Sequence, residues 1–363
     1  MSSPAEAGHE RETTVADIGE RALIERIRQR LPAAPASLPV GIGDDAAVAV
    51  PDRGALQVLT TDALVEGIHF DRRFSSPSDI GYKAVAVNLS DIAAMGASPR
   101  LALLSLMLPA SLSVGDLDQL IGGVVEMAAV AGLTVAGGNI TRSPGPLIVD
   151  VTVTGAVRPR RVLTRAGGRP GDGLYVTGAI GAATAGLEWL RAHPETKPER
   201  GVMAECVARH RRPEPRMRIG MLLGRNRAAT ACMDLSDGLA DAVRQVAAAS
   251  GTGAVVEAGA LPIHPGAVSW FAEAARDAIE ASVAGGDDYE LMFAVPRRAS
   301  GRLRHVIQQS RGVALTRIGE LTAEPGVHLR RDGQLVPLPS GFSHFAGGQT
   351  GVRQGSDPGR TAV

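Results

Sequence analysis

The sequence predicts an α/β (α+β) protein with two domains, and three observations support this prediction. Apolar runs of strand length alternate with segments of helical periodicity. The chain has 363 residues, of which 44% are hydrophobic, enough to bury more than one core. A basic segment rich in proline and glycine, residues 158–172, follows a predicted strand and marks a domain boundary.

The two ends of the chain differ in composition from the part between them. Residues 1–16 and 346–363 are rich in Gly, Ser, Pro and charge, so we expect flexible tails there. The predicted N-terminal domain is residues 17–157, and the predicted C-terminal domain is residues 158–345. Within the second domain, the charged residues 192–215 are expected to form a surface excursion.

Two strands and a helix are expected in the N-terminal domain. The apolar runs 101–108 and 147–157 have the length of buried strands. Between them, residues 114–131 have a helical pattern. This pattern opens at Ser113, a favoured N-cap residue, and closes at Gly132, which tolerates the left-handed conformation of many helix ends.

A second well-marked helix is expected after Ser236 and Asp237. Leu239 and Val243 lie on one apolar stripe, and Gly251 supplies a stop. This helix places an acidic, hydroxyl-bearing turn at its start.

Composition excludes several kinds of partner. Lys plus Arg and Asp plus Glu both total 38, and aromatic residues make up 3%, so no basic or stacking surface for nucleic acid is expected. No segment is long and apolar enough to span a membrane, and the N-terminus lacks a secretory signal. Cys206 and Cys232 are too few for a disulfide scaffold or a four-ligand zinc site, which favours reduced thiols and a cytoplasmic protein.

Short clusters of acidic or amide residues beside glycine or hydroxyl residues are the most informative feature. They adjoin predicted strands at 43–45, 60–62, 88–91, 137–139, 234–238 and 285–288. Converging carboxylates repel one another unless a cation neutralises them, and Mg²⁺ takes oxygen ligands that it commonly shares with phosphates. Because no Cys and His cluster accompanies them, the pattern favours magnesium over zinc, with a polyphosphate as ligand.

Each cluster also has a purely structural explanation. The pair beginning at Asp44 could form an ordinary polar turn, and Asp62 could cap the segment that follows it. Ser236 or Asp237 could cap the helix after it, and Asp91 could face solvent from a helix whose apolar stripe lies elsewhere. Six such clusters in one chain are harder to explain by turns alone.

Several well-known catalytic motifs are absent. There is no G-x-x-x-x-G-K-[ST] loop, and neither lysine, Lys83 or Lys197, lies in a glycine-rich loop, so a Walker-type NTPase is excluded. Protein-kinase, metalloprotease and serine-hydrolase motifs are also missing. His69 closes a run that begins at Asp62, although a lone histidine can equally be structural.

Five segments resemble one family, the thiamine-monophosphate kinases. They are GIGDDAAV at 41–48, TTDALVEGIHF at 60–70, GYKAVAVNLSDIAAMG at 81–96, DLSDGL at 234–239 and DYEL at 288–291. The similarity extends to GFSHF at 341–345, so it covers most of the chain. The two long segments are far more specific than a short glycine motif.

The resemblance implies the fold of the aminoimidazole-ribonucleotide-synthetase superfamily. Residues 17–157 would then bind ATP and Mg²⁺, and their four-stranded sheet would pair with that of a second subunit in a homodimer. The implied reaction is direct in-line transfer from ATP, the co-substrate, to thiamine monophosphate, giving thiamine diphosphate.

The resemblance also implies roles for individual residues. The implied metal ligands are Asp44, Thr60, Thr61, Asp62, Asp91, Asp234 and Asp237, with Asp62, Asp91 and Asp234 as the catalytic candidates. The implied cofactor contacts are Arg165, Ser236, Gly138 and Asn139. The implied contacts to the thiamine portion are His69, Asp287 and Phe342.

Three positions depart from the family pattern. Asn139 stands where the family usually has Asp, so one negative charge is lost from a metal-binding position. Asp287 replaces the usual Glu with a side chain one methylene shorter, and Phe342 lies at a variable aromatic position. Two alternatives therefore stay open: a relative that uses ATP on another acceptor, and a non-catalytic protein that binds nucleotide or thiamine phosphate.

Overall fold

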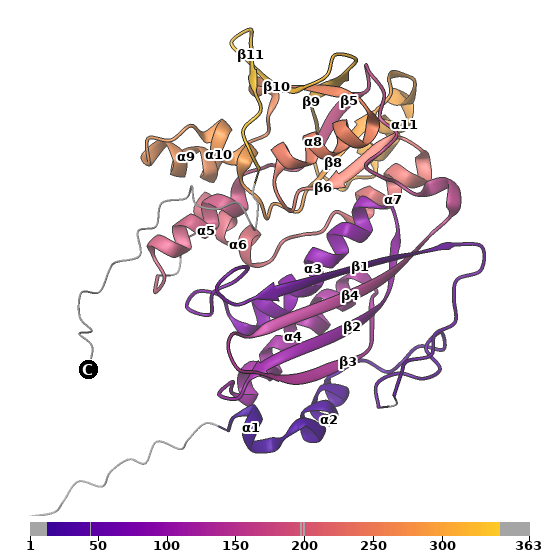
Figure 1. Ribbon diagram of the computed structural model, residues 1–363, viewed down its shortest axis with the longest axis vertical. Helices are drawn as coiled ribbons and strands as arrows, with labels where there is room; N and C mark the ends of the chain where they lie inside the picture. The colour runs from indigo at the N-terminus through magenta and orange to yellow at the C-terminus, as the bar shows by residue number, and fades with distance from the viewer. Residues whose placement is uncertain (1–12, 44, 197, 199, 342–363) are drawn as a thin grey trace, which may run out of the picture.

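The computed structural model describes residues 13–43, 45–196, 198 and 200–341 (Figure 1). Two predicted site residues, Asp44 and Phe342, and the predicted tail 346–363 lie outside the described residues. The mixed α/β class predicted from the sequence is confirmed, with one sheet in each half of the chain.

The first half forms a four-stranded sheet that is covered on one face by two helices (Figure 1). In order across the sheet, the strands are β1 (Leu56–Val65), β4 (Ile148–Val157), β2 (Ser98–Pro109) and β3 (Thr134–Ser143). β4 runs antiparallel to both of its neighbours, whereas β2 and β3 are parallel. The helices are α3 (Pro77–Ala94) and α4 (Val114–Ala131), and α1 (Val15–Ile18) and α2 (Glu20–Arg30) precede the sheet.

Local sequence explains these elements. Alternate residues of β4, namely Val149, Val151 and Val153, are buried against the helices, as a strand with one covered face requires. The predicted strands at 101–108 and 147–157 therefore correspond to β2 and β4. The predicted helix 114–131 matches α4, with Ser113 Oγ accepting from the backbone N–H of Asp116 at 2.9 Å.

The second half forms a seven-stranded mixed sheet with helices packed around it (Figure 1). In order across the sheet, the strands are β11 (Gln334–Pro337), β10 (Val327–Arg331), β7 (Gly253–Glu257), β9 (Leu315–Thr322), β5 (Gly173–Thr177), β8 (Leu291–Val295) and β6 (Ala231–Asp234). The helices are α5 (Ala182–Ala192), α6 (Val202–Arg211), α7 (Met217–Asn226), α8 (Leu239–Ser250), α9 (Pro265–Glu273), α10 (Ala278–Ala284) and α11 (Ser300–Gln308). Short 3-10 turns are η1 (Pro159–Arg161), η2 (Ala258–Ala260) and η3 (Arg297–Ala299).

The predicted helix after Asp237 is α8, which ends at Gly251 in the left-handed conformation. The predicted surface excursion at 192–215 is wrong in part. Helix α6 lies within it and packs on α5, and its residues Cys206, Val207 and His210 are buried. Its charged residues masked this apolar face in the sequence.

Helix α3 joins the two halves of the molecule. It packs against β1 and β4 of its own sheet and against α7 and β6 of the second half. Three of its polar residues, Lys83, Asn88 and Ser90, are consequently buried. Within the described ranges, no helix has the length and apolar character needed to cross a membrane.

Candidate active site between the two sheets

Three elements bring the central acidic residues together. Thr60 and Asp62 are alternate residues of β1 and so share the face that packs on α3. The hydroxyl of Thr60 donates to Oδ2 of Asp91 near the end of α3. One residue earlier on α3, Ser90 Oγ donates to Oδ2 of Asp234, the last residue of β6, at 2.7 Å. The strand order and helix packing therefore gather residues that lie far apart in sequence.

The carboxylates in this cluster disfavour one another's ionisation. Burial, followed by repulsion from Asp91, raises the pKa of Asp62 to about 7. Burial and the charge of Asp91 likewise raise the pKa of Asp234 to about 7. Burial also raises the pKa of Asp91, although the Thr60 hydrogen bond and the charge of Arg165 oppose this. A cation placed among these groups would relieve their repulsion.

The donor set suits a hard cation but is incomplete within the described residues. Carboxylate and hydroxyl oxygens are the ligands that Mg²⁺ prefers. However, no three carboxylate, imidazole or thiol side chains in the described part of the chain lie close enough together to hold a metal by themselves. Further oxygen atoms would have to come from phosphate, from water or from Asp44, which lies outside the described residues.

Arg165 and the turn at 235–238 lie beside this cluster. Burial raises the pKa of Asp91 and Asp234, and the positive charge of Arg165 partly opposes this rise. Nη1 of Arg165 donates to Oε1 of Gln245. The charge of Asp237 adds to the rise in the pKa of Asp62 that burial and Asp91 cause, so Asp237 lies near Asp62. The predicted roles of Arg165 as an ATP contact and of Asp237 as a metal ligand stay predictions.

Close backbone packing fixes this turn against the 285–288 loop. The N–H of Asp287 donates to the carbonyl of Ser236 at 2.7 Å, and the N–H of Tyr289 donates to that of Leu235 at 3.1 Å. Gly238 has φ +91°, and a Cβ there would lie 2.3 Å from the carbonyl oxygen of Gly285. Glycine at 238 therefore permits an approach that a side chain would block.

Other predicted residues do not join the cluster in one copy of the chain. The side chain of Thr61 points to the opposite face of β1, where its hydroxyl lies 3.0 Å from both Asp150 Oδ1 and Thr152 Oγ1. Gly138 and Asn139 are exposed on β3, at the far edge of the sheet from β1. Their implied roles stay predictions.

Asp287 lies in a separate polar group that the sequence did not predict. Lys83 Nζ donates to Asp287 Oδ2 at 2.8 Å, Tyr289 Oη donates to Oδ1 at 3.1 Å, and His210 Nδ1 lies 3.5 Å from Oδ2. Although burial opposes it, the charge of Lys83 brings the pKa of Asp287 below its usual value. Burial, reinforced by Lys83, lowers the pKa of His210 to about 3, so this imidazole is neutral.

Lys83 also connects this group to His69. Its Nζ lies 3.4 Å from the carbonyl oxygen of His69, and the side chain is 4% exposed. The Nδ1 of His69 accepts from the N–H of Val65 at 3.1 Å, which leaves the proton of a neutral ring on Nε2. A signal for Lys83 was present in the sequence, since it is one of two lysines and lies within the 81–96 segment.

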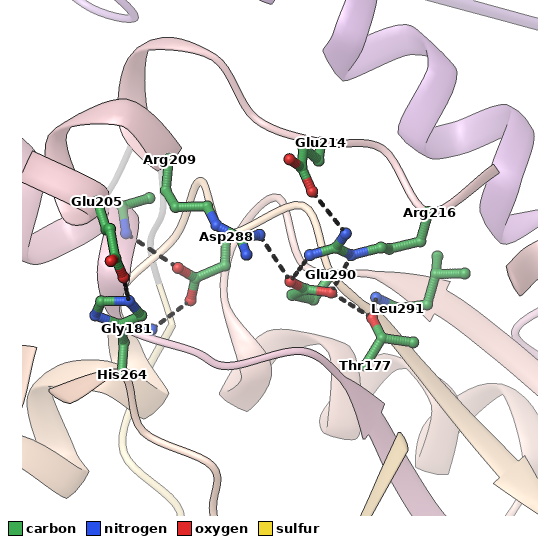
Figure 2. Close-up of polar contacts among 11 residues, drawn as sticks. Thr177, Gly181, Glu205, Arg209, Glu214, Arg216, His264, Asp288, Glu290 and Leu291 are labelled. Atoms are coloured by element: carbon green, nitrogen blue, oxygen red, sulfur yellow. Dashed lines mark hydrogen bonds and ion pairs between the residues drawn. The ribbon is translucent and has the colours of Figure 1, made fainter. Parts of the chain in front are cut away.

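The acids that follow Asp287 anchor its loop (Figure 2). Asp288 accepts from the N–H groups of Gly181 and Ala183, at 2.7 and 3.2 Å, near the start of α5. Glu290 is 1% exposed and accepts from Arg216 Nε at 2.6 Å and from Thr177 Oγ1 at 2.5 Å.

Asp287 itself has φ +67°, a conformation that few residues other than glycine adopt. The anchored residues Asp288 and Glu290 therefore hold the backbone of Asp287 in this conformation. The carboxylate of Asp287 is paired with Lys83.

The chain matches two family models in succession. Residues 43–157 match the AIR synthase related protein, N-terminal domain, and residues 169–332 match the AIR synthase related protein, C-terminal domain. The chain is also 37% identical over 331 residues to the thiamine-monophosphate kinase of Escherichia coli, covering 90% of this chain and 98% of that protein.

Two solved structures extend the similarity to three dimensions. The thiamine-monophosphate kinase of Stenotrophomonas maltophilia superposes with a TM-score of 0.77 at 35% identity, covering 87% of this chain and 97% of that one. AaThiL complexed with AMPPCP and TMP superposes with a TM-score of 0.72 at 32% identity, covering 91% of this chain and 98% of that one.

Proposed function

Because the chain belongs to the thiamine-monophosphate kinases, within the AIR synthase related family, we propose that it transfers the γ-phosphoryl group of ATP to thiamine monophosphate. The products are thiamine diphosphate and ADP. One observation carries the proposal: the fold gathers Asp62, Asp91 and Asp234 from three segments beside Arg165. The bound AMPPCP and TMP of a 32% identical relative support both substrates.

The reaction needs charge neutralisation more than proton transfer. A phosphate oxygen of thiamine monophosphate is anionic at neutral pH, so it can attack the γ-phosphorus without a strong general base. A new P–O bond forms to that oxygen as the bond to the β-phosphate oxygen breaks, and the electron pair leaves with ADP. Arg165 supplies positive charge beside the acids and can bind a phosphate through charge-assisted hydrogen bonds.

Magnesium is the proposed cofactor. Asp62, Asp91, Asp234 and the hydroxyl of Thr60 would supply part of its ligands, with Asp237 near them, and phosphate or water oxygens would complete the set. When bound, it neutralises charge on the two phosphate groups that must approach each other. The burial of Asp62 and Asp234 and their repulsion by Asp91 support this assignment, because a divalent cation among the three carboxylates would offset both effects.

His69 and Asp287 are proposed to contact the thiamine portion. The hydrogen bond from Val65 turns the Nε2–H of His69 away from the backbone. Lys83 contacts both the carbonyl oxygen of His69 and the carboxylate of Asp287. Asp287 keeps its charge because Lys83 holds its pKa low, so it can attract the cationic thiazolium ring.

A homodimer is proposed for a geometric reason. Asn139 on β3 pairs with Ser105 on β2, and Ser105 pairs with Asp150 on β4. Asp150 in turn pairs with Ala63 on β1, the neighbour of Asp62. Three strand spacings separate these positions, which is about 14 Å within one sheet. A contribution of Asn139 to an Asp62 site therefore requires a second copy of the chain.

The uncovered face of the four-stranded sheet supports this pairing. Leu59 on β1 and Leu103 on β2 point away from the helices and are 65% and 45% exposed. The strands β1 and β3 are the two edges of the sheet. A second sheet packed on this face would bury the leucines.

A cytoplasmic location is proposed as well. Both cysteines are buried and free, which suits a reducing compartment.

The test is an ADP-release assay with a panel of acceptors, with and without Mg²⁺. We expect ADP release that depends on both thiamine monophosphate and Mg²⁺, with one thiamine diphosphate formed per ADP. If thiamine monophosphate gives no product while another acceptor gives ADP, the chain acts on that other acceptor. Calorimetric binding of both ligands without turnover would make it a binding protein instead.

A further inference from the structure

A polar cleft lies at the junction of the two halves, and none of the described candidate site residues lines it. Its volume is about 400 Å³, and it lies between the starts of β1 and β2, the end of β4, η1 and α7. Six arginines line it together with one acid, Asp52. These arginines, here called the arginine cleft, are Arg53, Arg100, Arg158, Arg161, Arg218 and Arg225.

Most of this positive charge is uncompensated. Asp52 pairs with Arg100, at 2.5 Å between Oδ2 and Nε. Arg218 donates to the backbone oxygen of Gln309 at 2.8 Å, and Arg225 donates to the side-chain oxygen of Gln309 at 3.1 Å. Both acceptors are neutral. Among the described residues, no carboxylate pairs with Arg53, Arg158 or Arg161. Because the whole chain has a net charge of zero, this local excess does not reflect its average composition.

The walls of the cleft are well supported. On α7, a Cβ added at Gly224 would lie 2.4 Å from the carbonyl oxygen of Arg161, so helix and turn are in close contact. On the same helix, a Cβ at Gly220 would lie 1.9 Å from the carbonyl oxygen of Ala93 in α3. Arg161, Arg218 and Arg225 thus project from elements that are fixed against each other and against the helix that carries Asp91.

We propose that the arginine cleft binds the diphosphate group of a small molecule. Guanidinium groups bind phosphate oxygens in pairs, and a concave site of this volume has the size of a small-ligand pocket. No aromatic residue lines the cleft for base stacking, which disfavours single-stranded nucleic acid. The ligand would be a nucleoside diphosphate or, if the proposed function is correct, thiamine diphosphate.

The experiment uses inorganic pyrophosphate and calorimetry in EDTA. Without metal, the acidic cluster repels anions, whereas the arginine cleft needs no metal. We expect one pyrophosphate per chain, with affinity that falls as salt is added. The double variant Arg158→Ala, Arg161→Ala should weaken binding at least about tenfold, since each charge-assisted hydrogen bond is strong. Arg298→Ala, an exposed arginine outside the cleft, is the matched control and should not change affinity.

Two further titrations identify the source of the diphosphate. ADP binding more tightly than pyrophosphate would indicate a nucleotide, and tighter binding of thiamine diphosphate would indicate that compound. The proposal is overturned if pyrophosphate does not bind in EDTA, if the double variant binds it as well as wild type, or if a short oligonucleotide binds there more tightly. Kinase turnover of the same samples is an independent readout, because the double variant leaves the acidic cluster intact.

Discussion

At the scale of single residues, two of the three central aspartates are ambiguous in the sequence. Asp62 could cap the segment that follows it, and Asp91 could face solvent. The structure places Thr60 against Asp91 and Ser90 against Asp234, contacts that pair residues 31 and 144 positions apart. No local pattern could reveal these pairs, although the sequence did single out the three acids.

Asp62→Asn should abolish turnover without loss of fold. The amide keeps the shape of the side chain and removes a charge that burial and Asp91 disfavour, so stability in EDTA should stay equal or rise. The ADP-release assay and thermal denaturation in EDTA measure the two effects. Glu273→Gln, at an exposed position, is the control. Turnover close to wild type in Asp62→Asn would count against the metal assignment.

Lys83→Met should raise the KM for thiamine monophosphate more than it lowers kcat, because Lys83 positions Asp287 and the His69 segment. Removing one partner of this ion pair should also cost about 3 kcal/mol of stability. Adding Asp287→Asn should restore stability but not KM, since the unpaired charge is gone while the substrate contact is still missing. An unchanged KM in Lys83→Met would show that Lys83 has only a structural role.

Asp288 should give the protein a distinct pH dependence of stability. Burial raises its pKa to about 7, above its unfolded value of 3.8, so the folded state holds the proton between these values. Its contribution to stability is therefore present at low pH and is lost as pH rises toward 7, by up to about 1.4 kcal/mol per unit.

Urea unfolding of wild type and Asp288→Asn from pH 5 to pH 8 isolates this contribution. The stability difference between the two proteins should change up to about pH 7 and then become constant. A difference that is the same at every pH would contradict the assignment.

At the scale of elements, the sequence predicted β2, β4, α4 and α8 well because their patterns are local. It did not predict the environment of α3. An apolar stripe suggested one solvated face, but β6 and α7 cover that second face. Asn88 and Ser90 are buried because the two domains pack on α3. The spacing of apolar residues within α3 does not predict this packing.

Two adjacent glycines of α4 test how closely α3 and α4 approach. A Cβ at Gly123 would lie 1.9 Å from the carbonyl oxygen of Ser78, whereas a Cβ at Gly122 would meet nothing within 4 Å. Gly123→Ala should therefore destabilise the protein by about 1–3 kcal/mol. Gly122→Ala should stabilise it by up to about 1 kcal/mol through helix propensity. Chemical denaturation of both variants measures the difference, and equal effects would refute the close contact.

At the scale of the whole molecule, the sequence predicted an α/β protein but not which of its surfaces stay open. The uncovered sheet face and the distant position of Asn139 emerge only from the strand order. The same order explains why Thr61 and Asp62, adjacent in sequence, face different surroundings.

Leu59→Glu should disrupt the proposed dimer by placing a charge on the uncovered face of the sheet. Sedimentation should show a shift from dimer to monomer, and turnover should fall if the second copy completes the site. Val130→Glu on α4 is the matched control, because Val130 is 74% exposed on the helix side of the same domain. A monomeric wild-type protein with full activity would contradict this proposal.

The most direct test of the central claim is a ³¹P NMR time course of the protein with ATP and thiamine monophosphate. With Mg²⁺, we predict that the signals of ADP and of thiamine diphosphate grow together while those of ATP and thiamine monophosphate decline, and that EDTA stops all four changes. Release of inorganic phosphate without thiamine diphosphate, or formation of thiamine diphosphate in EDTA, would contradict the claim that the gathered aspartates and a divalent cation carry phosphoryl transfer.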